Sequence, residues 1–454
     1  MKTCRRWAAI LGLFLAAATV QASPPPAEVF YKDADILEAV LSPSGRRLAV
    51  TTAKGMPRVG LVVYDLAPGG RILRVAQFDD ADVIDVHWVN DERLVYSQTD
   101  RTEGSGRSIE ARGLFTVMAD GTKFKQLVRR RWKGVSTSRF ESPALDWNHR
   151  LLAIPPSTQD KVNDYVLLVE FSLDEYGYET PVWLNAATAN TRNFDDRQVP
   201  SAISWMADSL GEPRIAHSLD KGRLTARWLA PGSKTWTPLF ESSLLDAPFT
   251  VEAVDSKGGL FVSRGEGPLG YRALSRYEFD SGAPAAKPLV ATPGFDFRGD
   301  LVADETGRTL GVRLVVDGET TVWFDAAMKA FQDRADKLFA GHVNRIDCRR
   351  CGAPDMVALV RSYSDQDPGR LYLFQAKPPE GEKSWRLIKA VREDIRPEHM
   401  ATLELQRIKA RDGRDLPVWI TKRPDAQGPL PAVVLVHGLD QPPALLALGG
   451  LGLE

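Results

Sequence analysis

The stretch that decides the fold is ILEAVLSPSGRRLAVT, residues 36–51. Its two ends are short runs rich in Val, Leu, Ile and Ala, and the Ser-Pro-Ser-Gly between them is typical of a tight turn between strands. A further run of the same kind, VGLVVYDL at residues 59–66, follows after a loop. The unit is therefore a strand, a tight turn, a strand, a loop and a third strand.

The same unit recurs along the chain. One clear copy combines residues 83–97 with residues 113–117, and weaker copies lie at residues 202–228, 259–277 and 300–324. A repeated unit of roughly 40–60 residues with about four short strands is the signature of a β-propeller blade, which buries its faces only against its neighbours. A tandem array of β-sandwiches is the alternative. We predict a mainly β chain with a propeller over residues 23–395, and one helix at residues 326–338 that decorates a loop.

The overall charge of the chain gives no reason to expect a charged partner. The 58 Lys and Arg residues nearly cancel the 59 Asp and Glu residues, so no global field attracts nucleic acid or an anionic membrane. A basic run with aromatic residues, KFKQLVRRRWK at residues 123–133, could form a nucleic-acid groove, but we interpret it as the solvated edge of a blade. The eleven tryptophans, among them Trp88, Trp205 and Trp323, are expected to pack between blades.

The N-terminus has the pattern of a secretory signal peptide over residues 1–22. A basic start is followed by an apolar run at residues 7–20, and small residues allow cleavage between Ala22 and Ser23. The apolar run is shorter than the roughly 20 residues that a membrane-spanning helix needs. We therefore expect a periplasmic or secreted protein with no membrane attachment after cleavage; an uncleaved anchor is the alternative.

Export also affects the cysteines. Cys4 leaves with the signal, so the mature chain keeps only Cys348 and Cys351, in the sequence Cys-Arg-Arg-Cys. In an oxidising compartment a local disulfide is the expected state of such a pair. A structural zinc site needs four ligands, and no second Cys/His pair with matching spacing occurs. A redox motif would require a helix after the pair, and the setting here is turn-like. We expect no metal and no cofactor.

The composition changes near residue 396. A strand at residues 401–410, a turn containing Arg411-Asp412-Gly413-Arg414 and a strand at residues 416–421 precede a Pro- and Gly-rich loop. The next run, Ala-Val-Val-Leu-Val at residues 432–436, ends in His437-Gly438. A continuous apolar and β-branched run predicts a strand buried on both faces of a parallel sheet.

This order, together with SYSDQDPGRLYL at residues 362–373, resembles the S9 family of serine peptidases, of the prolyl oligopeptidase and acylaminoacyl-peptidase type. The resemblance implies a propeller, probably of seven blades in the family's manner, that caps an α/β-hydrolase domain, with oligopeptides entering a chamber between the two. Residues 396–438 would be the first strands of an incomplete α/β-hydrolase domain, and His437 and Gly438 the remnant of its oxyanion region. The Glu-Glu pair with which dipeptidyl-peptidase relatives hold a substrate N-terminus does not occur in the chain.

The family's chemistry needs a Ser on a strand-to-helix turn, G-x-S-x-G, with an Asp and a His that follow it. That motif does not occur in the 454 residues, and residues 439–454 have the composition of a low-complexity tail. A frameshift after codon 438 and a genuine short protein are the two explanations. We expect a secreted serine-type oligopeptide hydrolase by family, which lacks the Ser/Asp/His triad and is inactive as written. The alternative is a stand-alone periplasmic propeller that binds peptides or proteins.

Overall fold

The computed structural model describes residues 25–102, 111–130, 144–158, 160–173, 177–194, 197–424 and 426–435. Several predicted features lie outside these residues: the signal peptide with Ala22 and Ser23, His437 with Gly438, and the tail at residues 439–454. No helix among the described residues is long and apolar enough to cross a membrane.

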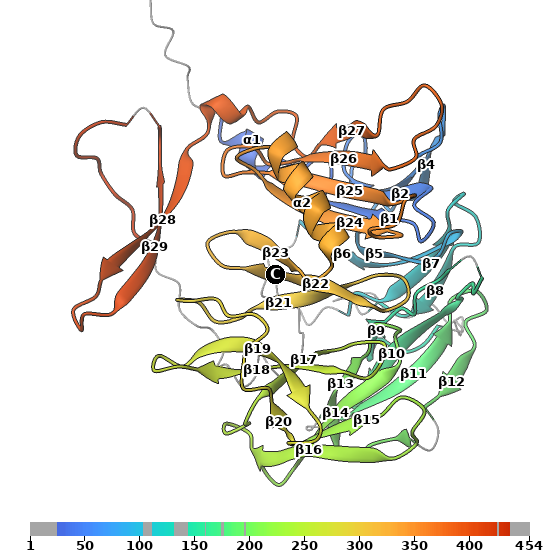
Figure 1. Ribbon diagram of the computed structural model, residues 1–454. Coiled ribbons are helices and arrows are strands. Elements are labelled where there is room, and N and C mark those ends of the chain that lie inside the picture. The colour runs from blue at the N-terminus through green and yellow to red at the C-terminus, as the bar shows by residue number, and fades with distance from the viewer. Residues whose placement is uncertain are drawn as a thin grey trace, which may run out of the picture.

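Seven small antiparallel sheets, the blades, follow one another around a ring in the described part of the chain (Figure 1). Blades 1 to 3 contain β1 (Glu38–Leu41), β2 (Arg47–Thr52), β3 (Gly60–Asp65) and β4 (Ile72–Ala76); β5 (Asp82–Asn90), β6 (Arg93–Thr99), β7 (Leu114–Met118) and β8 (Lys125–Val128); and β9 (His149–Ala153), β10 (Tyr165–Phe171), β11 (Glu179–Asn185) and β12 (Thr191–Asn193). Blades 4 and 5 contain β13 (Ala202–Ala207), β14 (Pro213–Asp220), β15 (Arg223–Leu229) and β16 (Trp236–Ser243); and β17 (Thr250–Val254), β18 (Leu260–Glu266), β19 (Tyr271–Glu278) and β20 (Ala283–Pro284). Blades 6 and 7 contain β21 (Gly299–Ala303), β22 (Thr309–Val315) and β23 (Glu319–Trp323); and β24 (Val343–Arg349), β25 (Val357–Tyr363), β26 (Arg370–Gln375) and β27 (Trp385–Ala390). The predicted propeller is confirmed, and its blades number seven.

Within each blade the strands pair in chain order. The opening stretch explains why: Gly45 adopts φ +72°, a conformation that glycine reaches without steric cost, so the chain reverses directly from β1 into β2. A Cβ atom on Gly45 would also lie 3.0 Å from Cβ of Val357 in blade 7, so the turn passes close to the last blade. The turn therefore needs glycine for both its conformation and its packing.

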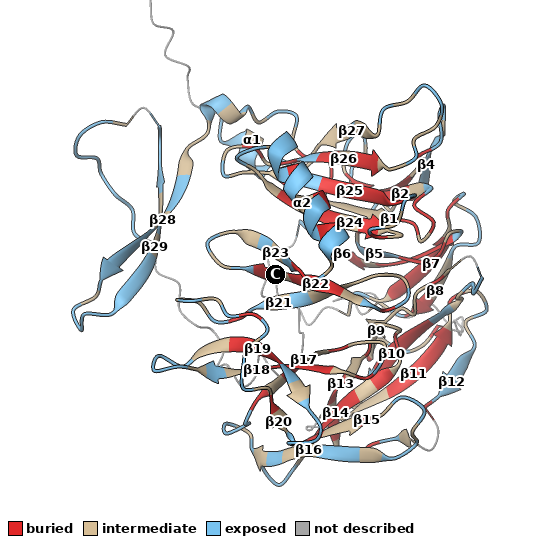
Figure 2. Cartoon of the chain, viewed as in Figure 1, coloured by how far each residue is buried: buried red, intermediate tan, exposed pale blue. Residues whose placement is uncertain are grey.

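The core of the protein lies between the blades and not within any one of them. Seven clusters of buried apolar side chains occur among the described residues, one at each contact between neighbouring blades. Trp88, Trp205 and Trp323 belong to three of these clusters, as predicted. The buried strand segments are coloured red in Figure 2. Cores shared between consecutive sheets around a ring exclude the tandem-sandwich alternative.

Helix α2 (Ala326–Leu338) has the predicted bounds, but its role differs from the prediction. It follows β23 in the only described blade with three strands, and Asp325 caps its first turn by accepting hydrogen bonds from the backbone N–H groups of Ala327 and Met328, both at 3.0 Å. Its buried residues, Met328, Phe331 and Ala335, pack between blades 6 and 7. The helix is therefore part of the core, because its apolar stripe faces a gap that three strands leave open, and it does not decorate a loop.

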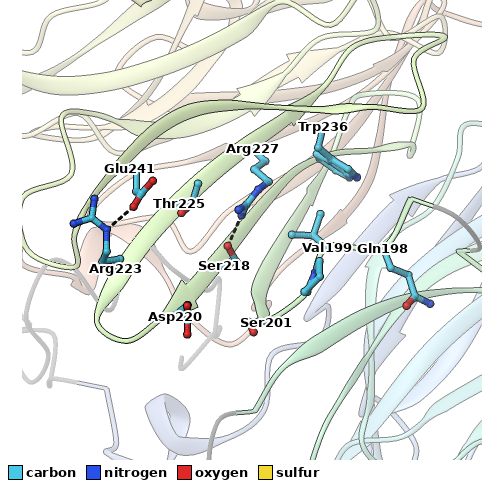
Figure 3. Close-up of a pocket in the computed structure, with 11 residues that line it drawn as sticks. Gln198, Val199, Ser201, Ser218, Asp220, Arg223, Thr225, Arg227, Trp236 and Glu241 are labelled. Carbon is cyan, nitrogen blue, oxygen red and sulfur yellow. Dashed lines mark hydrogen bonds and ion pairs between the residues drawn. The ribbon is translucent and has the colours of Figure 1, made fainter.

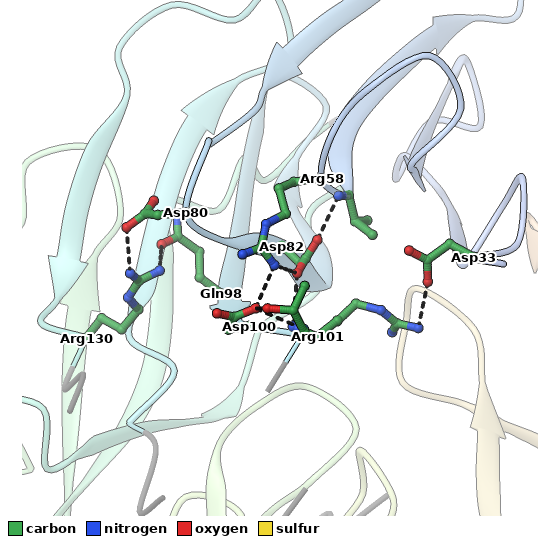
Figure 4. Close-up of polar contacts among 10 residues, drawn as sticks. Asp33, Arg58, Asp80, Asp82, Gln98, Asp100, Arg101 and Arg130 are labelled. Carbon is green, nitrogen blue, oxygen red and sulfur yellow. Dashed lines mark hydrogen bonds and ion pairs between the residues drawn. The ribbon is translucent and has the colours of Figure 1, made fainter. Parts of the chain in front are cut away.

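The basic run at residues 123–133 is described as far as residue 130. Its strand, β8, is the outermost strand of blade 2. Arg129 lies 3.0 Å from Asp146. Arg130 lies 3.1 Å from Asp80 (Figure 4). The basic side chains therefore pair with acidic groups at a blade edge, in keeping with the blade-edge interpretation.

The chain leaves blade 7 through the short 3₁₀ turn Pro397–His399 and enters the predicted hairpin, β28 (Thr402–Lys409) with β29 (Asp415–Lys422). The hairpin stands apart from the ring, and neither of its strands contains a buried residue (Figure 2). The strand predicted at residues 432–436 is not formed over the described residues 432–435, where Val433, Val434 and Leu435 are more than 80% exposed. A strand of a parallel sheet needs pairing partners and covered faces, and the described residues supply neither here.

Candidate functional site

The blades define two faces of the ring. The chain enters blade 1 and leaves blade 7 on the same side, where the backbone N–H of Asp35 donates to the carbonyl of Val391 over 2.8 Å. We call this side the entry face. The first strands of neighbouring blades contact one another and so lie innermost in the ring. They run away from the entry face, because in six blades a fourth antiparallel strand returns the chain to its starting side, and in blade 6 helix α2 follows the third strand instead. The inner strands therefore end on the opposite side, which we call the far face.

A cavity of about 520 Å³ lies among the ends of these inner strands, toward the far face. Five blades line it, with Val40 and Pro43, His87 and Trp88, residues 151–157, residues 303–305, and Cys348 and Arg349. We call it the central cavity. Trp88 is held in its wall because its indole N–H donates to the carbonyl of Val40 over 2.9 Å. The site thus depends on ring closure, since blades 1, 6 and 7 all contribute to one wall.

Charged groups stand in an otherwise apolar wall. The guanidinium of Arg349 donates to the carbonyl oxygens of Ser42 and Cys348 at 3.0 Å and of Leu41 at 2.5 Å. Burial lowers the pKa of Arg349, and nearby carboxylates oppose that effect. His87 is an exposed residue of the cavity wall, and desolvation by the protein around it lowers its pKa, which favours the neutral imidazole. One carboxylate oxygen of Glu305, Oε2, is buried without a hydrogen-bond partner among the described residues.

The wall of the central cavity suits a ligand that has a polar backbone and apolar side chains. Aliphatic, proline and indole surfaces offer apolar contact, while a neutral imidazole and an unpartnered carboxylate oxygen offer hydrogen bonds. The described residues contain no group of three or more His, Cys, Asp or Glu placed to hold a metal ion.

A second hollow, of about 490 Å³, lies in blade 4 near its contact with blade 3 (Figure 3). Its floor consists of paired side chains: Arg223 with Glu241, and Arg227 with Ser218. The indole of Trp236 at its edge donates to the carbonyl of Arg197 over 2.8 Å. Both arginines that line this hollow already have partners within the blade.

The described residues contain one buried serine–histidine pair, Ser204 and His217 on neighbouring strands of blade 4, with Oγ 3.0 Å from Nδ1. Burial lowers the pKa of His217 to about 4. Both side chains are closed off from solvent, and His217 makes no hydrogen bond to a carboxylate among the described residues. The pair therefore lacks the access and the third group that nucleophilic catalysis needs.

The predicted site residues divide into two groups. Cys348 and Cys351 are joined by a disulfide with their Cα atoms 5.4 Å apart, and Cys348 lines the central cavity. His437 and Gly438 lie outside the described residues. His87 and Arg349 have no local sequence signal that predicts a site. Their positions at the ends of inner strands become visible only when the repeats are aligned blade by blade.

No family model and no curated protein matches the chain. Solved structures similar to it include one from a study of two prolyl endopeptidases (13% identity, TM-score 0.47), prolyl oligopeptidase B from Galerina marginata (9%, 0.49) and a puromycin hydrolase variant (12%, 0.47). The matches cover 87%, 88% and 90% of this chain and 55%, 57% and 62% of those chains. The neighbours are S9 peptidases, the family that residues 362–438 resemble. The chain thus spans little more than half the length of these solved proteins.

Proposed function

We propose that the ring is the peptide-admitting propeller of an S9-type serine peptidase of the periplasm or cell exterior. The observation that carries the proposal is the order of elements at the end of the ring. The seventh blade contains the Ser-Asp and Pro-Gly segment, and it is followed by a hinge and by the hairpin β28–β29 with its Arg-Asp-Gly turn. The N-terminal sequence pattern and the Cys348–Cys351 disulfide support the oxidising location.

The proposed ligand is an oligopeptide, and the proposed binding site is the central cavity. Its volume of about 520 Å³ suits a few residues of an extended peptide, and its wall combines apolar surface with isolated hydrogen-bonding groups. The unpartnered Glu305 Oε2 can accept from a peptide N–H, and neutral His87 can pair with a peptide carbonyl or N–H according to its tautomer.

Peptide binding is tested by filling the cavity. Ala153 lies in its wall, so Ala153→Trp places an indole in the space that the peptide would use. Titration of a mixed oligopeptide library by calorimetry should give saturable binding to the unmodified protein and at least a tenfold weaker affinity for the variant. Ala286→Trp, at an exposed position away from the cavity, is the matched control. Equal binding by Ala153→Trp and the control would reject the site.

We further propose that these 454 residues have no hydrolase activity by themselves, because the sequence contains no G-x-S-x-G nucleophile turn. Incubation with a fluorophosphonate probe should leave every serine unlabelled by mass spectrometry. Covalent labelling of one serine, abolished by heat denaturation, would overturn this proposal.

A stand-alone binding propeller remains the second candidate, favoured by the continuous set of apolar cores around the ring. It predicts a soluble product that unfolds cooperatively; an insoluble or rapidly degraded product would count against it. Sequencing the gene past codon 438 separates the two candidates, since a downstream frame with G-x-S-x-G, Asp and His belongs only to the peptidase.

A further inference from the structure

One contact in the ring differs from the other six. Blades 1 and 7 lie side by side, yet they are at opposite ends of the propeller sequence and each keeps all its strands within its own sheet. We call this contact the ring seam. No strand joins the two blades, so the seam depends on the apolar cluster around Leu41, Leu48 and Leu359 and on the polar contacts at its two faces. A change in those contacts is therefore a change in ring closure.

Three polar contacts on the far face come from one four-residue segment of blade 7, residues 348–351, which we call the cysteine turn. A fourth comes from Arg386, which donates to the carbonyl of Leu66 in blade 1 over 3.1 Å. Arg349 donates to the carbonyl oxygens of Leu41 and Ser42 of blade 1, at 2.5 and 3.0 Å. Arg350 donates to the carbonyl of Ser44 over 2.9 Å. Three charge-assisted hydrogen bonds thus reach the first turn of blade 1, and charge-assisted bonds are the stronger kind.

The disulfide fixes the shape from which these bonds are made. Arg350 adopts φ +50°, a left-handed conformation that non-glycine residues adopt only when their surroundings impose it. The covalent bond between Cys348 and Cys351 closes the short loop that contains this residue. An ion pair of 2.8 Å with Asp355 further directs the Arg350 side chain. Without the covalent bond, the left-handed residue is free to relax and to redirect both arginines.

The sulfur atoms lie on the other side of the turn. Cys348 and Cys351 belong to the apolar cluster between blades 6 and 7, together with Met328 of α2 and Met356. The cysteine turn therefore contacts blade 6 through its sulfurs and blade 1 through its arginines. Cys348 is also one of the residues that line the central cavity, which is the side from which a small reductant would approach.

We propose that the Cys348–Cys351 disulfide is a redox-responsive site that controls the ring seam and, with it, the width of the central cavity. A small dithiol would supply the two electrons and two protons: its thiolate attacks one sulfur, the second thiol resolves the mixed disulfide, and the products are two cysteine thiols and the oxidised dithiol. The relaxed turn then withdraws Arg349 and Arg350 from blade 1. The inference goes beyond the proposed function, because it concerns the closure of the ring and not the ligand that the central cavity binds.

The test compares amide hydrogen exchange of the whole protein with and without dithiothreitol at one pH. Reduction should speed exchange at residues 38–52 and 343–363 at least tenfold and leave residues 202–229 of blade 4 unchanged. Alkylation and mass measurement establish that Cys348 and Cys351 are reduced. Failure of the disulfide to reduce, unchanged exchange at the seam after reduction, or an equal rise in all seven blades would each overturn the proposal.

Two variants separate the disulfide from the arginines. Cys348→Ala with Cys351→Ala should show fast seam exchange that dithiothreitol does not alter. Arg349→Gln with Arg350→Gln keeps the disulfide and should exchange fast at the seam even when oxidised, with little further change on reduction. Slow seam exchange in this arginine variant would show that the arginines do not carry the effect. The reductant experiment on the unmodified chain needs neither variant to fold.

Discussion

Single buried or half-buried polar side chains join strands and blades in this ring. The carboxylate of Glu38 accepts hydrogen bonds from the backbone N–H groups of Asp85 and Val86, both at 2.9 Å, and so connects blade 1 to blade 2. On the entry face Arg58 lies 3.0 Å from Asp82 and 2.6 Å from Asp100 (Figure 4). The hydrogen bond from Arg58 holds the pKa of Asp100 well below its usual range. Each such group is costly to bury alone, and its partner makes the burial possible.

His217 gives this burial a measurable pH dependence. Its pKa is about 4 in the fold against the ordinary value of 6.5, because burial disfavours the imidazolium. Between these values the unfolded chain binds more protons, so stability is complete above about pH 6.5 and is lost as the pH falls toward 4. The loss is on the order of 3 kcal/mol from this residue. Urea unfolding between pH 4 and 7 should therefore give a flatter pH profile for His217→Gln.

The matched control is His399→Gln, at an exposed histidine beyond the ring. Its pH profile should follow that of the unmodified protein. If His217→Gln also follows that profile, the buried imidazole is not the group that titrates.

Residue roles of this kind could largely not be predicted from the sequence. Arg349 and Arg350 have the appearance of ordinary charged residues in a turn. Their partners Leu41, Ser42 and Ser44 lie about 300 positions earlier in the chain, and no local pattern encodes such a contact. The disulfide was predictable because the spacing of the two cysteines and the predicted export signal are both local sequence information.

Elements were predictable where local signals agree. The turn at residues 42–46 and the hairpin β28–β29 combine alternating or β-branched runs with glycine turns, and both formed as predicted. The run at residues 432–435 shows the limit of such reasoning, because a parallel strand is stabilised by partners that its own sequence does not contain. Helix α2 shows the same limit for packing. Its bounds follow from local sequence signals, but its position between blades 6 and 7 depends on residues elsewhere in the chain.

The position of α2 can be tested through Phe331, which is 1% exposed and stacks on Trp385 at a centroid distance of 5.7 Å. Phe331→Ala removes a ring between blades 6 and 7 and should lower the free energy of unfolding by about 3–5 kcal/mol. Lys329→Ala, on the exposed side of the same helix, should change it by less than about 0.5 kcal/mol. Denaturant unfolding of both variants measures the contrast. A helix that only decorates a loop would give two small and similar values.

At the scale of the whole molecule, the stability of the fold comes from the ring of blades and not from the residues that follow blade 7. The core consists of contacts between successive blades, so each blade depends on two neighbours, and blades 1 and 7 depend on each other. The hairpin β28–β29 meets the ring at few points: the N–H of Leu403 donates to Asp365 over 2.8 Å, and Arg407 lies 5.2 Å from the ring centre of Phe295. Neither hairpin strand has a buried residue.

A chain that ends at Met400 should therefore keep the fold of the propeller. It retains the entry-face contacts of Glu393 and Asp394 with Lys54 and Lys32, and it removes exposed apolar groups such as Trp419 and Val433. We expect its free energy of unfolding to lie within about 0.5 kcal/mol of the longer chain's, because no core contact is lost. Solubility should rise, since exposed apolar surface promotes association.

The control is a chain that ends at Gln375 and so lacks β27, whose Trp385 packs on Phe331 and Phe374. Removing that strand exposes the edge of blade 7 beside the ring seam, where Arg386 also donates to the carbonyl of Leu66 in blade 1 over 3.1 Å. Cooperative thermal unfolding, followed by circular dichroism, should persist in the chain that ends at Met400 and be lost in the one that ends at Gln375. Loss of cooperativity in both would mean that the ring needs the hairpin, and that closure at the seam does not by itself complete the fold.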